Sequence, residues 1–258
     1  MQPTSRWLIS RPHPFCQPRL RLYCFAYAGG SAAVFQPWQA LLPPDVEVCA
    51  IQLPGRGIRF SETPCTSMPA LLDQLSAAMA GQPPLPCVFF GHSLGGLIAF
   101  ELARHRMARA LPLPLRVIVS GAEAPRHRAP PKNLHAMPDA QLIAALREYK
   151  GTPEEVLDNR ELMALLAPSI RADFALVEQY VYQDGKPLSM PLTVFAGKRD
   201  DHIVPENVQY WQKETSAAFR VQWFEGDHFF INSEREAVLA CVKAELEDLA
   251  ELAEMAEL

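Results

Sequence analysis

Short apolar runs alternate with amphipathic segments along most of this 258-residue chain. Runs rich in β-branched and aromatic residues predict strands, and helical spacing of apolar residues follows most of them. The predicted strands cover residues 20–29, 46–55, 87–91, 115–123, 192–198 and 219–226, and the predicted helices cover 35–42, 67–81, 94–106, a stretch from about 205, and 234–258. Strands that alternate with helices in this way favour an α/β fold with a mainly parallel sheet and helices on both faces.

The alternation stops between about residues 124 and 189, where helical patterns replace the strand runs. A helical insertion of this length inside an α/β sheet is typical of a lid over one end of the sheet. A peripheral helical subdomain without a gating role is the alternative. We therefore predict one α/β domain over residues 1–258 with a lid insertion at about 124–189, and a final helix that packs on the surface rather than forming a coiled coil.

Nearly half of the residues are hydrophobic (49%), which is enough for a large buried core. The six cysteines form no C-x-x-C pair, and three lie in apolar runs where a free thiol behaves as a small hydrophobe. A reducing cytoplasm is therefore the expected location. The first residues lack the apolar segment of a signal peptide, and no run approaches about 18 apolar residues, so we expect neither secretion nor a membrane span.

The net charge of −5 argues against general nucleic-acid binding, but the charge is distributed unevenly. Residues 1–150 carry 15 basic and 8 acidic side chains, whereas residues 151–258 carry 9 and 21. We therefore expect an acidic partner to dock on the first half, and a solvated surface without a partner is the alternative. The basic residues in question are Arg104, Arg106, Arg109, Arg126, Arg128 and Lys132.

Residues 87–106, CVFFGHSLGGLIAFELARHR, contain a serine in a glycine-rich turn between a predicted strand and a predicted helix. Gly91 to Gly95 match G-x-S-x-G, and strand, turn and helix in this order are typical of a nucleophile elbow. Glycines relieve crowding there, so that a strained serine projects above the sheet, and the helix N-terminus favours an anionic intermediate. Ser93 is therefore the predicted nucleophile, with an ordinary turn residue as the alternative.

A serine hydroxyl needs a base, usually a histidine, and in the elbow order this base follows the last strand. His228 meets this condition, since it lies in FEGDHFFIN directly after the last predicted strand. Other histidines precede the first strand, flank the serine, or lie on the elbow helix and at the start of the lid: His13, His92, His105, His127 and His135. We expect four of these to be surface residues. His92, the residue before the serine, is expected to point away from it.

The acid that orients the base is expected after the preceding strand, where the sequence reads LTVFAGKRDDHIVPEN. Such a carboxylate holds the imidazole in its useful tautomer and stabilises the imidazolium. Either Asp200 or Asp201 can serve, and we favour Asp200, which lies three residues past Gly197. The DDH run also suggests a metal site, but no second cluster at ligand spacing accompanies it, so no metal is expected.

Acyl transfer also needs hydrogen-bond donors for the oxyanion. The N–H of Leu94, directly after the serine, is one candidate, and the loop in FAYAGGSAAVF after the first predicted strand is expected to supply another. An ordinary strand-to-helix turn is the alternative interpretation of that loop. Neither G-x-x-x-x-G-K-[ST] nor G-x-G-x-x-G occurs, so we expect no nucleotide or dinucleotide cofactor.

In six segments the chain resembles the stand-alone type II thioesterases that accompany nonribosomal peptide and polyketide synthases. The segments are FAYAGGSAAVFQPW, LPGRGIRFSETP, GHSLGG, SIRADFALVEQYVY, LTVFAGKRDDHIV and GDHFFI, and they span about residues 20–232. The resemblance implies an α/β-hydrolase fold with a helical lid. It also implies hydrolysis of acyl thioesters on the phosphopantetheine arm of acyl- or peptidyl-carrier proteins, which removes misprimed or stalled acyl groups.

The resemblance further implies a role for each matching residue: Ser93 as nucleophile, His228 as base, Asp200 as acid, and the N–H groups of Ala28 and Leu94 as the oxyanion hole. In the expected reaction the serine attacks the thioester carbonyl, the pantetheine thiol leaves, and water activated by the histidine releases the acid.

Helical spacing within the lid offers Phe174, Val177 and Tyr180 as lining for the acyl chain, with ordinary packing residues as the alternative. Three other functions stay open at this point. They are a carboxylic ester hydrolase acting on a small molecule, a chain-terminating fatty acyl-carrier thioesterase, and an inactive fold used for docking.

Overall fold

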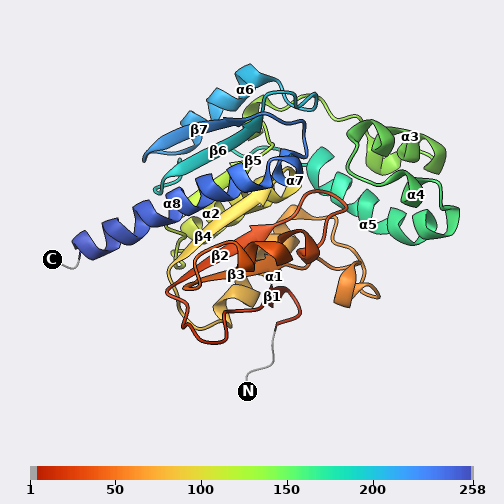
Figure 1. Ribbon diagram of the computed structural model, residues 1–258. Coiled ribbons are helices and arrows are strands. Elements are labelled where there is room, and N and C mark those ends of the chain that lie inside the picture. Colours follow the sequence, from red (N-terminus) through yellow and green to blue (C-terminus); the bar gives the residue numbers. More distant parts are fainter. Residues whose placement is uncertain (1–4, 257–258) are drawn as a thin grey trace.

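The computed structural model describes residues 5–256 (Figure 1). Within that range the strands form one seven-stranded sheet in the order β1-β3-β2-β4-β5-β6-β7, and only β1 runs antiparallel to its neighbour. The strands are β1 (Leu8–Ser10), β2 (Leu20–Phe25), β3 (Val46–Ile51), β4 (Cys87–His92), β5 (Arg116–Ser120), β6 (Leu192–Gly197) and β7 (Phe219–Phe224). The mainly parallel sheet that the sequence predicts is confirmed.

Helices connect these strands in the alternating pattern of the sequence. The α-helices are α1 (Met68–Ala80), α2 (Leu94–Ala108), α3 (Asp139–Tyr149), α4 (Glu154–Leu157), α5 (Arg160–Glu178), α6 (Pro205–Gln209), α7 (Phe230–Ser233) and α8 (Arg235–Ala256). Short 3-10 helices are η1 (Ala32–Ala40), η2 (Gly57–Arg59), η3 (Pro125–His127), η4 (Leu134–Ala136) and η5 (Tyr210–Glu214).

Two elements differ from the sequence-based prediction, and each difference has a local cause. Residues 35–42 fall largely in η1 rather than in an α-helix, because Pro37 lies inside this segment and cannot donate a backbone hydrogen bond. The sequence pattern does not predict β1, because three residues are too few for a period-two alternation to stand out.

Side chains of successive strand residues point into two separate hydrophobic cores. In β2, Leu22 and Cys24 belong to one core, whereas Tyr23 and Phe25 belong to the other. Helices α1 and α2 pack on the Tyr23 side, and η1 and α8 pack on the Leu22 side, where Figure 1 shows α8 crossing the sheet. Burial on both faces explains why the strands have near-continuous apolar sequences.

The strand order reverses between β2 and β4, because β3 lies on one side of β2 and β4 lies on the other. Phe25 at the end of β2 pairs with Gly91 near the end of β4, so the carboxyl ends of these two parallel strands are adjacent. In open α/β sheets, ligands bind in the crevice outside the strand ends at such a reversal. The loop after β2 and the turn after β4 therefore meet where a binding site is expected.

The start of α2 approaches the end of β2 so closely that no side chain fits between them. A Cβ atom at Gly95 would overlap the carbonyl oxygen of Phe25, and a Cβ atom at Gly91 would overlap the carbonyl oxygen of Gly95. The two glycines of the G-x-S-x-G motif therefore allow strand, turn and helix to pack against one another, as a nucleophile elbow requires.

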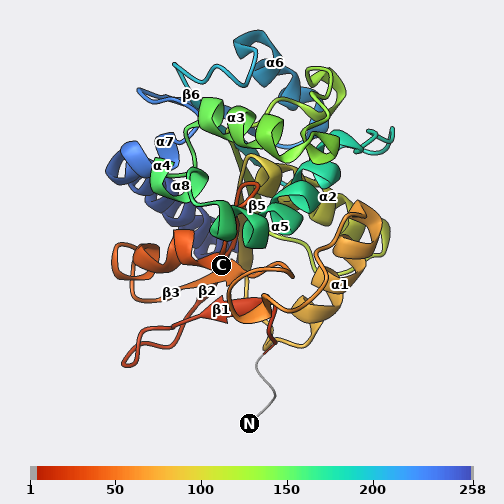
Figure 2. The same cartoon turned by 90° about the vertical axis from the view of Figure 1, so that its right-hand side faces the viewer.

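The predicted insertion lies between β5 and β6 and consists of η3, η4 and the helices α3, α4 and α5. It has a small hydrophobic core of its own, formed by Leu134, Leu142, Leu146, Leu157, Met163, Ile170 and Phe174. These helices, in green, lie beside the sheet in Figure 1 and in front of it in Figure 2. We call this segment, residues 124–189, the lid.

The last helix, α8, packs on the sheet through Val238, Val242 and Leu246, as the prediction of a surface-packed terminal helix requires. Residues 257 and 258, which the sequence pattern includes in this helix, lie outside the described residues. No helix within residues 5–256 has both the length and the apolar character of a membrane span. All six cysteines are described, and all are free thiols.

Substitution of Gly95 by alanine is expected to lower the free energy of unfolding by more than about 2 kcal/mol, because the new methyl group would collide with backbone rather than with a movable side chain. Urea denaturation of Gly95→Ala measures this loss. The matched control is Gly81→Ala at the end of α1, where φ is −78° and the nearest neighbour of the new Cβ is 3.6 Å away. If the two variants had equal stability, the close packing at Gly95 would be contradicted.

Candidate active site

Ser93 lies in the turn between β4 and α2 with backbone angles of φ 55° and ψ −117°. A non-glycine residue with this conformation is strained and needs support from its surroundings. The Ser93 N–H donates a 2.7 Å hydrogen bond to the carbonyl oxygen of Ser120 at the end of β5, and the Ser93 carbonyl oxygen accepts from Gly96 at 2.9 Å. The turn is therefore held from both neighbouring elements, and the serine lines the crevice at the strand ends.

The structure brings the three predicted residues Ser93, His228 and Asp200 into one hydrogen-bonded line. The Nε2 atom of His228 lies 3.0 Å from the Oγ atom of Ser93, and its Nδ1 atom lies 2.8 Å from the Oδ2 atom of Asp200. A carboxylate only accepts hydrogen bonds, so Nδ1–H donates to Asp200 and Nε2 is left to accept the serine proton. Asp201 is exposed and does not take part in this line of contacts.

Asp200 stays ionised because its hydrogen bonds outweigh its burial. Burial raises the pKa of this carboxyl, but the hydrogen bonds from the His228 ring and from the His202 backbone N–H lower it, and the net pKa lies below its usual value. The His202 N–H donates to Oδ1 at 2.9 Å, which leaves Oδ2 for the histidine. Asp200 can therefore act as a fixed negative charge beside an imidazolium.

His92 points away from the Ser93 hydroxyl, as expected, but it contributes to the site in a way that the sequence does not reveal. Its side chain is fully buried, with Nδ1 2.8 Å from the Oγ of Ser120 and Nε2 2.8 Å from the carbonyl oxygen of His228. Burial and the nearby His228 ring lower the pKa of His92 to about 3, so its ring is neutral at physiological pH. Nε2–H therefore donates to the backbone carbonyl oxygen of His228 and anchors the loop that carries His228.

The backbone N–H groups of Ala28 and Leu94 are oriented by their local structure. Leu94 is the first residue of α2, so its N–H has no partner within the helix, and the helix dipole makes this end positive. Ala28 lies in the turn Tyr27–Gly30, which is closed by a 2.9 Å hydrogen bond from the Gly30 N–H to the Tyr27 carbonyl oxygen. Both residues line the same cavity as Ser93, so their N–H groups are candidates for binding an oxyanion.

A cavity of about 800 Å³ extends from Ser93 and His228 beneath the lid. Phe174, Val177 and Tyr180, which the sequence proposes as lining residues, all line it. The sequence does not identify the rest of the lid lining, which includes Leu134, Leu146, Tyr149, Leu166, Ile170 and the segment 128–132. The amphipathic pattern of residues 138–151 contains a signal for Leu146 and Tyr149, because their spacing puts both on one helical face.

The lid directly contacts the loop that carries Asp200. The ring of Tyr149, on α3, stacks on the ring of His202 with centroids 3.9 Å apart and an angle of 6° between the planes. The same tyrosine approaches His228 edge-on at 6.2 Å. Burial and the nearby His228 ring lower the pKa of His202, which favours its neutral form in this stack. The lid therefore forms part of the wall around His228.

The three basic residues on α2 that the sequence offers for docking differ in their surroundings. Arg106 is buried and donates to the Pro112 carbonyl oxygen, and Arg104 forms an ion pair with Glu101 at 2.8 Å. Arg109 is exposed, but it lies 16 residues along the helix from Ser93, which corresponds to about 24 Å. A count of charges along the sequence takes no account of burial. In the structure, α2 directs these side chains into the protein or away from the cavity.

The second basic group lies at the cavity itself. Arg126, Arg128 and Lys132 all line it, and the side chain of Arg126 is 51% exposed, with an ion pair to Asp184. Among residues 5–256, no group of three or more histidine, cysteine, aspartate or glutamate side chains has the arrangement of a metal site.

Residues 20–246 match the sequence profile of the thioesterase domain family. LgrE of Brevibacillus parabrevis, which is named a linear gramicidin dehydrogenase, is 39% identical over 246 residues, covering 94% of this chain and 93% of LgrE. The present chain lacks the G-x-G-x-x-G motif of dinucleotide-binding dehydrogenases.

Two solved structures of type II thioesterases have the same fold. BorB from the borrelidin biosynthetic cluster has a TM-score of 0.84 and 33% identity, with 93% of this chain and 97% of BorB covered. YbtT from the yersiniabactin nonribosomal peptide and polyketide pathway has a TM-score of 0.80 and 28% identity, with 92% and 96% covered. The chain therefore belongs to the thioesterase domain family.

Proposed function

We propose that this protein is a type II thioesterase that hydrolyses acyl thioesters on the phosphopantetheine arm of a carrier protein. Its substrates are misprimed or stalled acyl groups on a nonribosomal peptide or polyketide synthase, since the similar type II thioesterase YbtT comes from a pathway of this kind. The observation that carries the proposal is the line of hydrogen bonds from Asp200 through His228 to Ser93 at the floor of a lidded cavity.

In the first half of the proposed reaction, the Oγ atom of Ser93 attacks the thioester carbonyl carbon while Nε2 of His228 takes its proton. The negative charge that develops on the carbonyl oxygen is stabilised by the N–H groups of Ala28 and Leu94. The C–S bond breaks, and the proton held by His228 passes to the departing pantetheine thiolate. A thiolate is a good leaving group, so this step needs little help from a general acid.

In the second half, water enters the space that the thiol has left, and His228 removes a proton from it as it attacks the acyl-serine carbonyl. The oxyanion forms again at the same N–H groups, the C–O bond to Ser93 breaks, and His228 returns its proton to the serine. The acid product then leaves. Asp200 stabilises the imidazolium in both halves without itself being protonated.

The cavity supports an acyl group as the bound portion, since lid side chains such as Phe174 and Val177 form one of its walls. We propose that one hydrolase domain with its lid carries out the whole reaction without a cofactor. We also propose a reducing, cytoplasmic location, because six free cysteines, two of them fully buried in strands, are characteristic of such a compartment.

We propose that the carrier protein docks near Arg126 and Lys132 at the cavity mouth rather than at Arg109. Carrier and basic surface attract one another through the phosphate of the arm and acidic side chains, so the attraction falls with salt. Arg109 lies about 24 Å along α2 from Ser93, at the far end of that helix. A carrier docked there would have to deliver the arm to Ser93 from the end of α2 that is farthest from the serine.

Hydrolysis of an acyl-carrier thioester is expected to be faster, in kcat/KM, than hydrolysis of the matched oxygen ester, and Ser93→Ala is expected to lower the thioester rate by at least about 10³-fold. Product release from several acyl-loaded carriers, followed by mass spectrometry, measures both. A strong preference for the oxygen ester would favour a small-molecule esterase instead. A preference for long fatty acyl chains would indicate a chain terminator, and an unchanged rate in Ser93→Ala would mean that the triad is irrelevant.

Asp200→Asn is expected to lower kcat by about 10³- to 10⁴-fold, because the amide no longer selects the useful tautomer of His228 or stabilises the imidazolium. Asp201→Asn is the matched control, since this neighbouring carboxylate is exposed and outside the line of contacts, and its kcat is expected to stay within about threefold of wild type. Steady-state kinetics on one acyl-carrier substrate compare the two. A larger loss in Asp201→Asn would reassign the acid.

Charge reversal at Arg126 and Lys132 together is expected to raise KM for an acyl-carrier substrate by about tenfold at low ionic strength, with a smaller effect as salt is added. Arg109→Glu serves as control, because it reverses the charge of one exposed arginine far from the cavity mouth, which is half of the charge change in the double variant. KM is measured over a series of salt concentrations. Equal KM values for all three proteins at every salt concentration would indicate a solvated basic surface without a docking role.

A further inference from the structure

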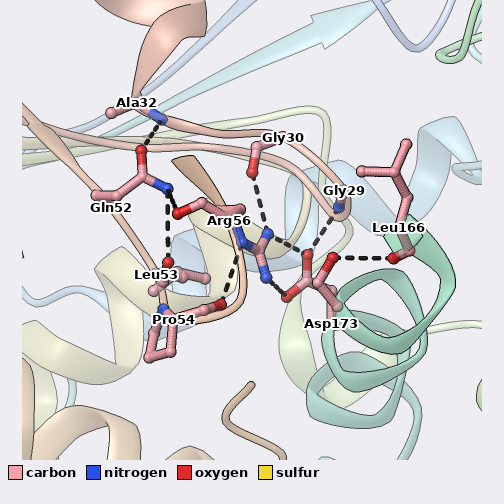
Figure 3. A network of polar contacts seen from close by, with 10 residues as sticks. Gly29, Gly30, Ala32, Gln52, Leu53, Pro54, Arg56, Leu166 and Asp173 are labelled. Carbon is pink, nitrogen blue, oxygen red and sulfur yellow. Dashed lines mark hydrogen bonds and ion pairs between the residues drawn. The ribbon is translucent and has the colours of Figure 1, made fainter. Parts of the chain in front are cut away.

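A buried ion pair joins the lid to the loop after β3. The guanidinium of Arg56 contacts both carboxylate oxygens of Asp173, with Nη1 2.5 Å from Oδ2 and Nη2 2.7 Å from Oδ1. Asp173 lies on the lid helix α5 and is 1% exposed, and Arg56 is 7% exposed. Figure 3 shows this pair and the polar groups around it. The hydrolysis mechanism proposed above gives neither residue a role.

Both partners of the ion pair also bind the backbone of the turn Tyr27–Gly30. The Gly29 N–H donates to Oδ2 of Asp173 at 2.7 Å, and Nη1 of Arg56 donates to the Gly30 carbonyl oxygen at 3.0 Å (Figure 3). Gly29 has φ +77°, which is typical of the third residue of a type II turn. The peptide between Ala28 and Gly29 has different orientations in type I and type II turns. By accepting from the Gly29 N–H, the Asp173 carboxylate favours the type II orientation of this peptide.

These contacts determine where the Ala28 N–H points. The Gly30 N–H holds the Tyr27 carbonyl oxygen at 2.9 Å, and because a trans peptide is planar, the Ala28 N–H in the same peptide points the opposite way. Asp173 holds the next peptide through Gly29, and Arg56 holds the end of the turn through Gly30. Two peptide groups that follow the Ala28 N–H are therefore held by side chains from other parts of the chain. This N–H is the one that is proposed to bind the oxyanion.

Arg56 is itself fixed by the strand end and the loop that carry it. Its backbone carbonyl oxygen accepts a 3.2 Å hydrogen bond from the Gln52 side chain, and its Nε donates to the Pro54 carbonyl oxygen at 3.4 Å. The Gln52 amide also accepts from the Ala32 N–H at 3.3 Å, just beyond the turn. The guanidinium therefore has little freedom to follow a displaced turn, and the ion pair acts as a rigid support.

We infer that Asp173 and Arg56 are positioning residues for catalysis, which hold the Ala28 N–H of the oxyanion hole in its working orientation. The inference rests on the proposed function, since it assigns a purpose to one of the two oxyanion donors. It makes the lid helix α5 a support of the catalytic machinery as well as a wall of the cavity. If α5 shifts, Asp173 moves with it, and the Gly29 N–H loses its hydrogen-bond acceptor.

A second buried ion pair provides a matched comparison. Nε of Arg21 lies 2.7 Å from Oε2 of Glu47, with side chains 6% and 9% exposed, close to the 8% and 1% of the Arg56–Asp173 pair. Arg21 and Glu47 are paired residues near the amino ends of β2 and β3, at the opposite end of the strands from Ser93. Removal of this pair therefore tests the general effect of losing a buried ion pair without touching the turn.

The experiment compares two double variants, Arg56→Met with Asp173→Leu and Arg21→Met with Glu47→Leu. Replacement of both partners leaves no lone buried charge, so both proteins are expected to fold. The first double variant is expected to lose about 10- to 100-fold in kcat with KM within about threefold, because a misplaced donor affects the transition state rather than ground-state binding. The second is expected to keep the wild-type kcat. Arg56→Met with Asp173→Asn, which retains an oxygen for the Gly29 N–H and leaves no lone buried charge, is expected to recover part of the loss.

A trifluoromethyl ketone analogue of the acyl-pantetheine substrate gives a readout that loss of stability alone would not move. It forms a tetrahedral adduct with a nucleophilic serine, and the adduct oxygen occupies the oxyanion hole. Its inhibition constant is expected to rise in the Arg56/Asp173 variant in parallel with the loss in kcat/KM, while a thioether analogue without a carbonyl binds as it does to wild type. Thermal unfolding curves, measured alongside, give the fraction of each protein that is folded at the assay temperature.

Equal kcat values for wild type and the Arg56/Asp173 variant, after correction for the folded fraction, would overturn the inference. An equal loss of kcat in both double variants would also overturn it, because the effect would then belong to any buried ion pair. If wild type hydrolysed only oxygen esters, the proposed function would fail while the same kinetic comparison on esters still tested the positioning role. Ester hydrolysis forms an oxyanion at the same carbonyl position.

Discussion

The strained turn at Ser93 is the constraint on which the rest of the site depends. Its φ of 55° persists because β5 binds its N–H, α2 begins at the next residue, and the flanking glycines allow strand and helix to pack without side chains between them. This turn raises the hydroxyl above the sheet edge and leaves the Leu94 N–H without a helical partner. The proposed nucleophile and one proposed oxyanion donor are thus positioned by the same piece of backbone.

The groups proposed to act on Ser93 come from loops that the parallel sheet brings to one edge. Asp200 follows β6 and His228 follows β7, and both are buried, so their hydrogen bond is protected from competing water. His92 connects this arrangement to the elbow, because its neutral ring spans from Ser120 to the backbone of His228. His228, the proposed base, is therefore held through its ring by Asp200 and through its backbone by His92.

The lid has its own hydrophobic core, yet its polar contacts tie it to the catalytic loops. Asp173 on α5 binds the turn after β2 through Gly29, and Tyr149 on α3 stacks on His202 beside the base. A buried carboxylate costs free energy unless it is paired and hydrogen-bonded, and Arg56 and Gly29 together meet that requirement. The residues proposed to bind the acyl group and those around the proposed oxyanion site are therefore parts of one packed unit.

The sequence by itself determined the α/β fold, the helical insertion, the elbow at Ser93 and the loops in which a base and an acid belong. These features depend on local periodicity and on chain order, which a single sequence contains. Only the tertiary structure decided that Asp200 rather than Asp201 contacts His228, that Arg106 is buried, and that Arg56 meets Asp173 across 117 residues. Such outcomes depend on which side chains the packing brings together. Contacts between segments that are distant in the chain produce no local pattern in the sequence from which they could be predicted.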